Sequence, residues 1–296
     1  KDGSIGERTA DYFYPISIVE KEAILQVDGI YKSFGVVKAL KDVSISFLPG
    51  EIHGLIGENG SGKSTLSSII SGIYSCNQGE MILDGKVYKP MSIMDGERHG
   101  ICMIVQEMGT IGGITVAANV FAGKEELFSR LGIVNPKAMN RAAQEALDKI
   151  GASYIKAENK IDEESFENRK IVEIARAMFN DVKVLIIDET TTALSQKGRE
   201  LIYQIMDKLK NENKVVIFIS HDLDELTEHC NTVTVLRDGV YIKTLHGEEI
   251  QPDVMRQLMI GREVQDNYYR DDYDDYRGGE DVITVENVCT EGGLHN

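Results

Sequence analysis

The feature that most constrains the fold is a glycine-rich loop between an apolar strand and a helix. Residues 57–65 read GENGSGKST and fit the phosphate-binding pattern G-x-x-x-x-G-K-[ST]. The apolar run EIHGLI (51–56) precedes the loop, and TLSSIISGI (65–73) follows it with apolar residues at helical spacing. Because such a loop presents backbone N–H groups to phosphate oxygens, the chain is expected to bind a nucleotide.

Each part of the loop has an expected role toward the phosphates. The glycines let the backbone turn its amides inward, and Lys63 reaches the β- and γ-phosphates. The Ser64 hydroxyl can ligate Mg²⁺. The predicted nucleotide contacts in the loop are Gly57, Glu58, Asn59, Gly60, Ser61, Gly62, Lys63, Ser64 and Thr65.

Three short, continuous apolar runs indicate strands that are buried on both faces of a parallel sheet. They are ICMIV (101–105), VKVLIID (182–188) and VVIFIS (215–220). Helical patterns lie between them, at 136–151, 170–179 and 197–212. Alternating segments predict peripheral strands at 23–31 and 39–47 and Asp-Gly hairpins at 79–88 and 232–245. This order predicts an α/β fold with antiparallel and helical additions.

Polar residues follow the predicted buried strands, at the sheet edge where α/β proteins bind ligands. Asp188 is expected to hold Mg²⁺ directly or through water, and Glu189 to orient or deprotonate the attacking water. Gln106 is expected to contact Mg²⁺ or the water, and His221 to donate to the γ-phosphate. Either of the last two residues alone is usually a solvated loop residue, and their order along the chain supports the assignment. Lys63, Gln106, Glu189 and His221 are thus the predicted catalytic residues, and Ser64, Gln106 and Asp188 the predicted metal ligands.

These motifs and their order resemble the ATP-binding cassette (ABC) ATPases over roughly residues 23–289. The matching stretches are KSFGVVKALKDVS, LIGENGSGKSTL, VQEM, TVAANVF, VEIARA, VLIIDETTTAL, ISHDLDEL, TVLRDG and MIGRE. The resemblance is greatest to the first half of the tandem ATPase subunits of bacterial monosaccharide importers.

The resemblance implies a P-loop NTPase core with an antiparallel β subdomain and a helical subdomain at about 107–180, using ATP and Mg²⁺. It also places Phe34 where the family stacks an aromatic ring on adenine, and TALS (192–195) at the family's D-loop.

The sequence departs from the family at the signature, which reads LSGGQ or LSxGE elsewhere. Here the positions hold Glu164, Ser165, Phe166, Glu167 and Asn168. A Glu167 side chain would block close backbone approach and bring negative charge beside phosphate. Glu163, Glu164 and Glu167 instead suit the first turn of a helix facing water, so we expect this signature to be non-functional.

A second departure is Thr190, where the family usually has proline after the Asp-Glu pair. We expect it to loosen the turn after Glu189 without removing a reacting group. With its signature lost, the chain by itself is expected to bind Mg·ATP with little hydrolysis.

The expected organisation has four parts: an extension at 1–22, an ABC ATPase domain at 23–261, an acidic linker at 262–280, and a second cassette beginning at 281–296. DVITVENVC (281–289) aligns without gaps on AILQVDGIY (23–31), although any half-buried strand alternates in this way. With the resemblance, this alignment favours a tandem protein.

Charge and hydropathy limit the expected partners. A net charge of −16 argues against nucleic acid, and no apolar run is long enough to cross a membrane. The resemblance implies membrane permease subunits, a second cassette of the same polypeptide, an extracytoplasmic sugar-binding protein acting indirectly, and a place at the cytoplasmic face of the membrane. Two alternatives stay open: a soluble tandem ATPase acting on ribosomes or nucleic acid, and a binding-only regulatory cassette.

Overall fold

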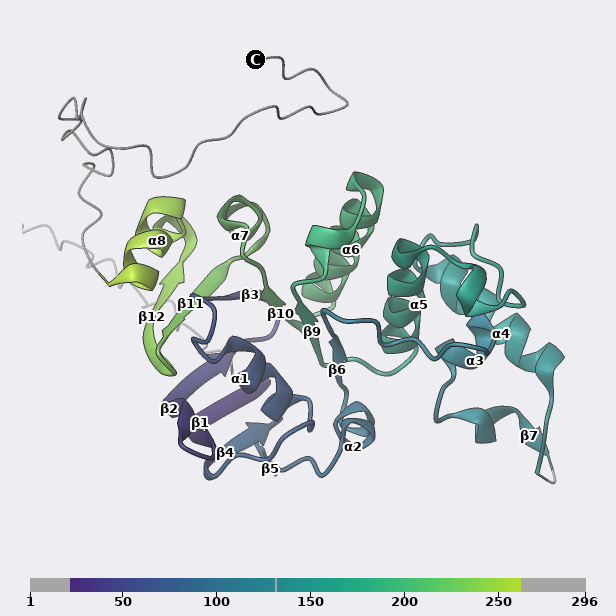
Figure 1. The fold of residues 1–296 in the computed structure, drawn as a ribbon, viewed down its shortest axis with the longest axis horizontal. Coiled ribbons are helices and arrows are strands. Elements are labelled where there is room, and N and C mark those ends of the chain that lie inside the picture. Colours follow the sequence, from purple (N-terminus) through teal and green to yellow (C-terminus); the bar gives the residue numbers. More distant parts are fainter. Residues whose placement is uncertain (1–21, 131, 262–296) are drawn as a thin grey trace, which may run out of the picture. The chain divides into compact units, whose positions relative to one another are not determined.

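The centre of the fold is a six-stranded, mostly parallel sheet (Figure 1). The structure, a computed structural model, describes residues 22–130 and 132–261. Adjacent strands pair in parallel, except the antiparallel hairpin at one edge. In spatial order the strands are β12 (Val240–His246), β11 (Thr232–Arg237), β3 (Glu51–Ile56), β10 (Val215–Ile219), β9 (Val184–Asp188) and β6 (Ile101–Ile104).

Both faces of this sheet are covered, which explains the continuous apolar runs of its strands. On β9, Leu185 and Ile187 pack into a core shared with helices of the second half of the chain. Val184 and Ile186 face the opposite core, shared with the antiparallel sheet. The predicted buried strands are therefore confirmed, together with the α/β class.

The antiparallel sheet belongs to the N-terminal part and appears in purple and blue in Figure 1. Helix α1 (Lys63–Ile70) contributes to the core beneath it. The predicted hairpin turns at Asp84 and Gly85, both with positive φ. In spatial order the strands are β2 (Val37–Phe47), β1 (Leu25–Phe34), β4 (Gln78–Leu83) and β5 (Lys86–Tyr88), and α2 (Ile93–Arg98) follows in the chain.

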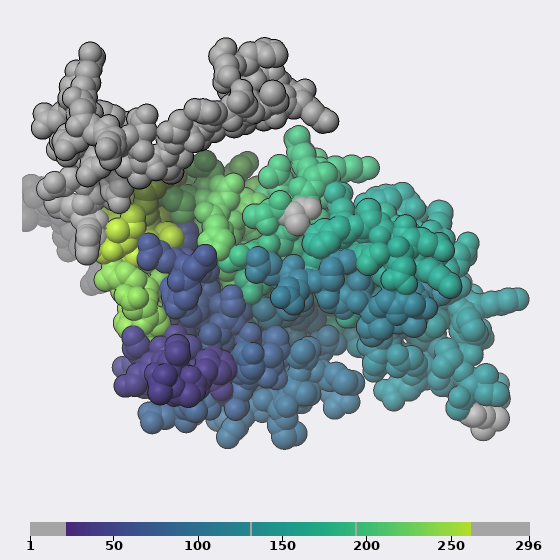
Figure 2. Space-filling model, viewed as in Figure 1, coloured from purple at the N-terminus to yellow at the C-terminus, as the bar shows by residue number. Residues whose placement is uncertain are grey.

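A helical part follows β6 and matches the segment expected at about 107–180. Its core includes the Phe121 ring, whose centroid lies 4.5 Å from Phe128 and 4.7 Å from Phe179. Its residues, coloured teal, form a continuous surface beside the blue residues in the space-filling view (Figure 2). Its elements are α3 (Val116–Val120), β7 (Ser129–Arg130), β8 (Ile133–Val134), α4 (Pro136–Lys149) and α5 (Phe166–Met178).

The remaining helices are α6 (Gln196–Asn211), α7 (Leu223–His229) and α8 (Pro252–Ile260), and single 3₁₀ turns include η3 (Thr191–Ala193). The helix predicted at 170–179 begins earlier, at Phe166, because Ser165 caps it. The proposed linker and second cassette, and the extension apart from residue 22, lie outside the described residues. Within 22–130 and 132–261, no helix combines the length and apolar content needed to cross a membrane.

Candidate functional site

The phosphate loop is clamped between two strands at positions that require glycine. A Cβ at Gly57 would lie 2.1 Å from the Leu236 carbonyl oxygen of β11. A Cβ at Gly62, where φ is 102°, would lie 2.8 Å from the Ala39 carbonyl oxygen of β2. Since a side chain would collide with backbone at both places, the two glycines fix the path of the loop from β3 into α1.

Lys63 is held at the base of this loop. Its side chain is buried, and Nζ donates to the carbonyl oxygens of Gly57 at 2.8 Å and Glu58 at 3.2 Å. Burial lowers the pKa of Lys63, while the charges of Glu189 and Asp188 oppose that effect. A phosphate entering the loop can replace the two carbonyls as the acceptor of this ammonium group.

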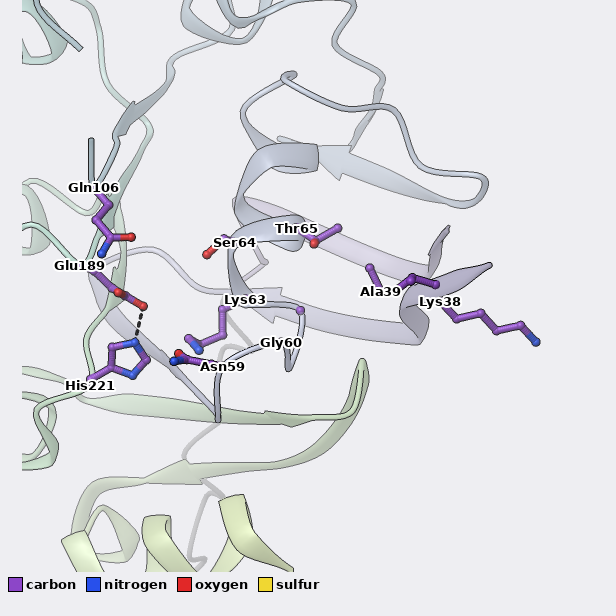
Figure 3. Close-up of a pocket in the computed structure, with 12 residues that line it drawn as sticks. Lys38, Ala39, Asn59, Gly60, Lys63, Ser64, Thr65, Gln106, Glu189 and His221 are labelled. Carbon is purple, nitrogen blue, oxygen red and sulfur yellow. Dashed lines mark ion pairs between the residues drawn. The ribbon is translucent and has the colours of Figure 1, made fainter. Parts of the chain in front are cut away.

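A pocket of about 630 Å³ brings the predicted groups together. Side chains from β6, β9 and β10 ends face the loop across it (Figure 3). Gly57, Glu58 and Ser61 lie in the loop but do not line this pocket. The lining residues are Val37, Lys38, Ala39, Asn59, Gly60, Gly62, Lys63, Ser64, Thr65, Gln106, Glu189 and His221.

Glu189 and His221 form a pair on the wall of the pocket. Oε1 of Glu189 lies 2.6 Å from Nε2 of His221, as drawn in Figure 3. The Glu189 N–H donates to the Ile219 carbonyl oxygen at 3.0 Å, and its φ of 45° is left-handed. A carboxylate bonded to an imidazole at the edge of a phosphate pocket can accept a proton from water.

Asp188 has the character of a metal ligand. It is buried, and its Oδ1 finds no hydrogen-bond partner among the described residues. Burial, and then the charge of Glu189, raise the pKa of Asp188 to about 6, against the opposing effects of Lys63, Ser64 and His221. A buried, unpartnered carboxylate oxygen is costly unless a ligand satisfies it.

The donors present fit Mg²⁺, which takes oxygen ligands and is usually held by one or two carboxylates together with phosphates and water. Ser64 and Gln106 line the pocket and have further oxygens, and Ser64 lies within hydrogen-bond reach of Asp188, which does not itself line the pocket. The described residues contain no cluster of three or more His, Cys, Asp or Glu side chains suited to a metal.

Phe34 is the last residue of β1, next to the turn into β2, and it is not among the residues that line the pocket. Its ring packs edge-on against Tyr74 at a centroid distance of 5.2 Å, and Nζ of Lys32 lies 5.0 Å from its centroid. Phe34 is 43% exposed. Adenine stacking on Phe34 stays a prediction.

Residues 164–168, where the family has its signature, lie at the start of α5. Their polar groups bond within the chain. Ser165 Oγ accepts from the Asn168 N–H at 3.1 Å. Glu167 accepts from the Ser195 N–H and hydroxyl, both at 3.0 Å. Glu167 lies in the first turn of α5, as expected, but it is half-buried, and its carboxylate bonds Ser195, the residue that caps α6. Gly198 leaves room for it, since a Cβ there would lie 2.9 Å from Glu167 Oε1.

Sequence reasoning missed three charged residues of α5 that hold the segment around Gln106. Nζ of buried Lys170 donates to the carbonyl oxygens of Val105 and Glu107, on either side of Gln106, and to Glu173 at 3.2 Å. Glu173 accepts from the Gly109 N–H at 2.7 Å.

Arg176 donates to the Gly109 carbonyl oxygen at 3.1 Å and to the Asn119 carbonyl oxygen at 2.8 Å. The spacing of Lys170, Glu173 and Arg176, three residues apart on one helix, is a signal that could have marked them as a group.

Thr190 does not act as expected. Its side chain is buried, and its hydroxyl donates to the Asp188 carbonyl oxygen at 3.0 Å. The threonine thus ties the turn after Glu189 instead of loosening it.

Comparison with known proteins gives consistent matches. The sequence profile of the family described as ABC transporter matches residues 40–192. The chain is 36% identical over 263 residues to the ribose import ATP-binding protein RbsA of Chromobacterium violaceum, covering 89% of this chain and 51% of that protein. It is 33% identical over 274 residues to the protein of the same name from Clostridium perfringens strain SM101, covering 92% and 54%. The chain thus spans about half the length of the curated relatives it matches.

Solved structures give the same fold. The ADP conformation of MJ1267, an ATP-binding cassette of an ABC transporter, superposes with a TM-score of 0.69 at 26% identity, covering 82% of this chain and 100% of that one. The dimeric cassette MJ0796 superposes with a TM-score of 0.65, covering 75% and 98%. Its identity of 24% supports the shared fold alone.

Proposed function

The chain belongs to the ABC transporter family, and on that premise we propose that it binds and hydrolyses ATP to power a bacterial importer. The observation that carries the proposal is the Glu189–His221 pair facing the phosphate loop across one pocket. A loop alone would bind phosphate. The facing carboxylate and imidazole add the groups that activate water.

The proposed roles follow from where the residues lie. Lys63 and the loop amides bind the phosphates, and Glu189 accepts the proton of the attacking water. His221 holds the Glu189 carboxylate and donates toward the γ-phosphate. Asp188, Ser64 and Gln106 would hold Mg²⁺, which neutralises phosphate charge when it is bound.

The proposed cargo is a monosaccharide, because the relatives are named ribose import ATP-binding proteins. The proposed partners are permease subunits in the membrane, and indirectly an extracytoplasmic sugar-binding protein. We place the chain at the cytoplasmic face, where ATP is available.

We further propose that this chain is the first cassette of a tandem. In this family the signature of one cassette serves the phosphate loop of its partner, and the Glu167 carboxylate of this signature bonds inside the chain, so a second copy of this chain would not complete the site on its loop. A second cassette beginning at 281–296 would supply a signature, in keeping with relatives about twice as long as this chain.

The test is Glu189→Gln in the full-length protein with its permease. ATP turnover is expected to fall by about 100-fold or more, because the general base is removed, while ATP binding is kept. Glu145→Gln, at an exposed position of α4, is the matched control and should turn over ATP normally.

Unchanged turnover in Glu189→Gln would refute the catalytic assignment. Nucleotide binding without any turnover in the unaltered full-length protein would instead favour a binding-only cassette.

A further inference from the structure

One carboxylate outside the pocket gathers hydroxyl groups from three other elements. Oε2 of Glu225, on α7, accepts from Thr191 Oγ1 at 3.0 Å and from Ser220 Oγ at 2.5 Å. Its Oε1 accepts from the Tyr203 hydroxyl of α6. Thr191 begins the turn after β9, and Ser220 follows β10. Glu225 therefore joins the two loops that carry the catalytic pair.

Thr191 and Ser220 lie close in the chain to the catalytic pair, so their contacts with Glu225 also position that pair. Thr191 stands two positions after Glu189, and Ser220 directly precedes His221. Both hydroxyl residues are buried, at 1% exposure, so their positions are fixed by their partners. Glu225 itself does not line the pocket. It acts on Glu189 and His221 through their neighbours.

A helix-capping role does not account for the Glu225 carboxylate. Asp222 caps α7, and Glu225 stands three positions later, where a capping-box glutamate returns to the N–H of the cap residue. Here the Asp222 N–H donates to Ser220 Oγ at 3.1 Å instead. The carboxylate is directed away from its own helix, toward Ser220 and Thr191.

The backbone of Glu189 shows why a fixed turn is needed. Its φ of 45° is left-handed, a conformation that a glutamate keeps only when the surrounding structure imposes it. The N–H of Glu189 is bonded to β10, and the Thr191 hydroxyl is bonded to Glu225. These contacts hold the turn from both sides of the strained residue.

We propose that Glu225 is a positioning residue that sets the approach of Glu189 to His221 by holding Thr191 and Ser220 together. The proposal rests on the proposed ATPase function. Without the Glu225 carboxylate, two buried hydroxyls lose their acceptor and the two loops move independently. The nucleotide is expected still to bind, because the hydrogen bonds described for Glu225 go to Thr191, Ser220 and Tyr203, outside the phosphate loop.

The experiment compares Glu225→Ala and Glu225→Gln in the full-length protein with its permease. For Glu225→Ala, kcat is expected to fall about 10- to 100-fold, with the ATP affinity and KM within about twofold. Glu225→Gln should restore most of kcat, because its amide oxygen still accepts from Thr191 and Ser220. Tyr203→Phe removes the one hydrogen bond described for Glu225 that does not come from the two loops. This variant should keep kcat within about twofold.

A double-mutant cycle with His221→Ala separates positioning from general stability. If Glu225 acts through the pair, Glu225→Ala should lower kcat little further once His221 is gone. If Glu225→Ala does not fold, Ser220→Ala and Thr191→Val each remove one donor and should each lower kcat severalfold at unchanged KM.

The outcomes distinguish this proposal from the function on which it rests. Turnover that survives Glu189→Gln overturns the ATPase assignment. Turnover that is lost in Glu189→Gln but unchanged in Glu225→Ala overturns the positioning role alone. Multiplicative losses of kcat in Glu225→Ala and His221→Ala also overturn it, because they show independent effects.

Discussion

The phosphate loop and the first turn of α5 are the two regions that face phosphate in this family, and they treat polar groups in opposite ways. Ser61 Oγ in the loop and Asp188 Oδ1 at the end of β9 are buried with no partner among the described residues. At α5, Ser165 Oγ accepts from Asn168 and the Glu167 carboxylate from Ser195. The first region keeps buried polar atoms without partners, and the second bonds its polar groups within its own chain.

The difference shows that an evolved binding site can be recognised by what it lacks. Buried polar groups without partners cost stability, and a protein keeps them where a ligand repays the loss. Once the ligand role is gone, the same type of position can carry a stabilising contact. In this chain Glu167 makes such a contact, with Ser195 at the start of α6.

The largest expected change in stability comes from the buried pair of Lys170 and Glu173 on α5. Lys170→Met should lower the free energy of unfolding by about 3–5 kcal/mol, because buried Glu173 loses its cation. Denaturant unfolding measures this loss.

Adding Glu173→Gln to Lys170→Met is the control, since it removes the stranded charge but keeps an acceptor for the Gly109 N–H, and it should recover much of the loss. A loss below about 1 kcal/mol in Lys170→Met would show that the buried Lys170–Glu173 pair contributes little to stability.

At Asp188, at the end of β9, a substitution is expected to raise the free energy of unfolding. Asp188→Asn should raise the free energy of unfolding by roughly 1–3 kcal/mol at pH 8, because burial disfavours the charged carboxylate. It should also lower ATP turnover of the full-length protein by about 100-fold or more, because the metal ligand is weakened.

The pH dependence of this gain has a definite sign. The folded chain keeps the Asp188 proton up to about pH 6, and the unfolded chain loses it near pH 4. The advantage of Asp188→Asn over the unaltered chain should therefore grow as the pH rises through this window and stay constant above it. If the stability difference between Asp188→Asn and the unaltered chain does not change between about pH 4 and 7, burial does not raise the pKa of Asp188 as described.

Restoring the family residue at the signature gives the smallest effect. Glu167→Gly should lower the free energy of unfolding by about 1–2 kcal/mol, because the cap on Ser195 is lost and a glycine enters the first helical turn. Thermal or denaturant unfolding measures it, with Glu167→Gln as the control that keeps one acceptor. No loss in Glu167→Gly would mean that the contact with Ser195 adds nothing.

Much of the framework could be predicted from the sequence because it depends on local patterns. Continuous apolar runs located β6, β9 and β10, and the rule that parallel strands end at one edge predicted that Gln106, Glu189 and His221 lie together. The short helices α2, α3, α7 and α8 were missed because they span too few turns to show a helical period clearly.

The contacts that distinguish this chain could not be read in the same way. Glu167 reaches a partner 28 positions away, and Lys170 one 65 positions away. Such pairs depend on how α5 packs against other elements, and the sequence of α5 predicts its helix without its neighbours. Charge alone therefore suggested a solvated face for Glu167, where packing provides a hydrogen-bond donor.

The position of β3 in the sheet has a consequence for the order in which the protein matures. Strand β3 lies between β10 and β11, and the Ile52 N–H donates to the Asn231 carboxamide, 179 positions further along the chain. The wall that confines Gly57 is likewise Leu236 of β11. During synthesis the glycine-rich loop leaves the ribosome early. It has no contact with β11 until that strand has also been made. Nucleotide capture by the nascent chain therefore reports that translation has passed β11.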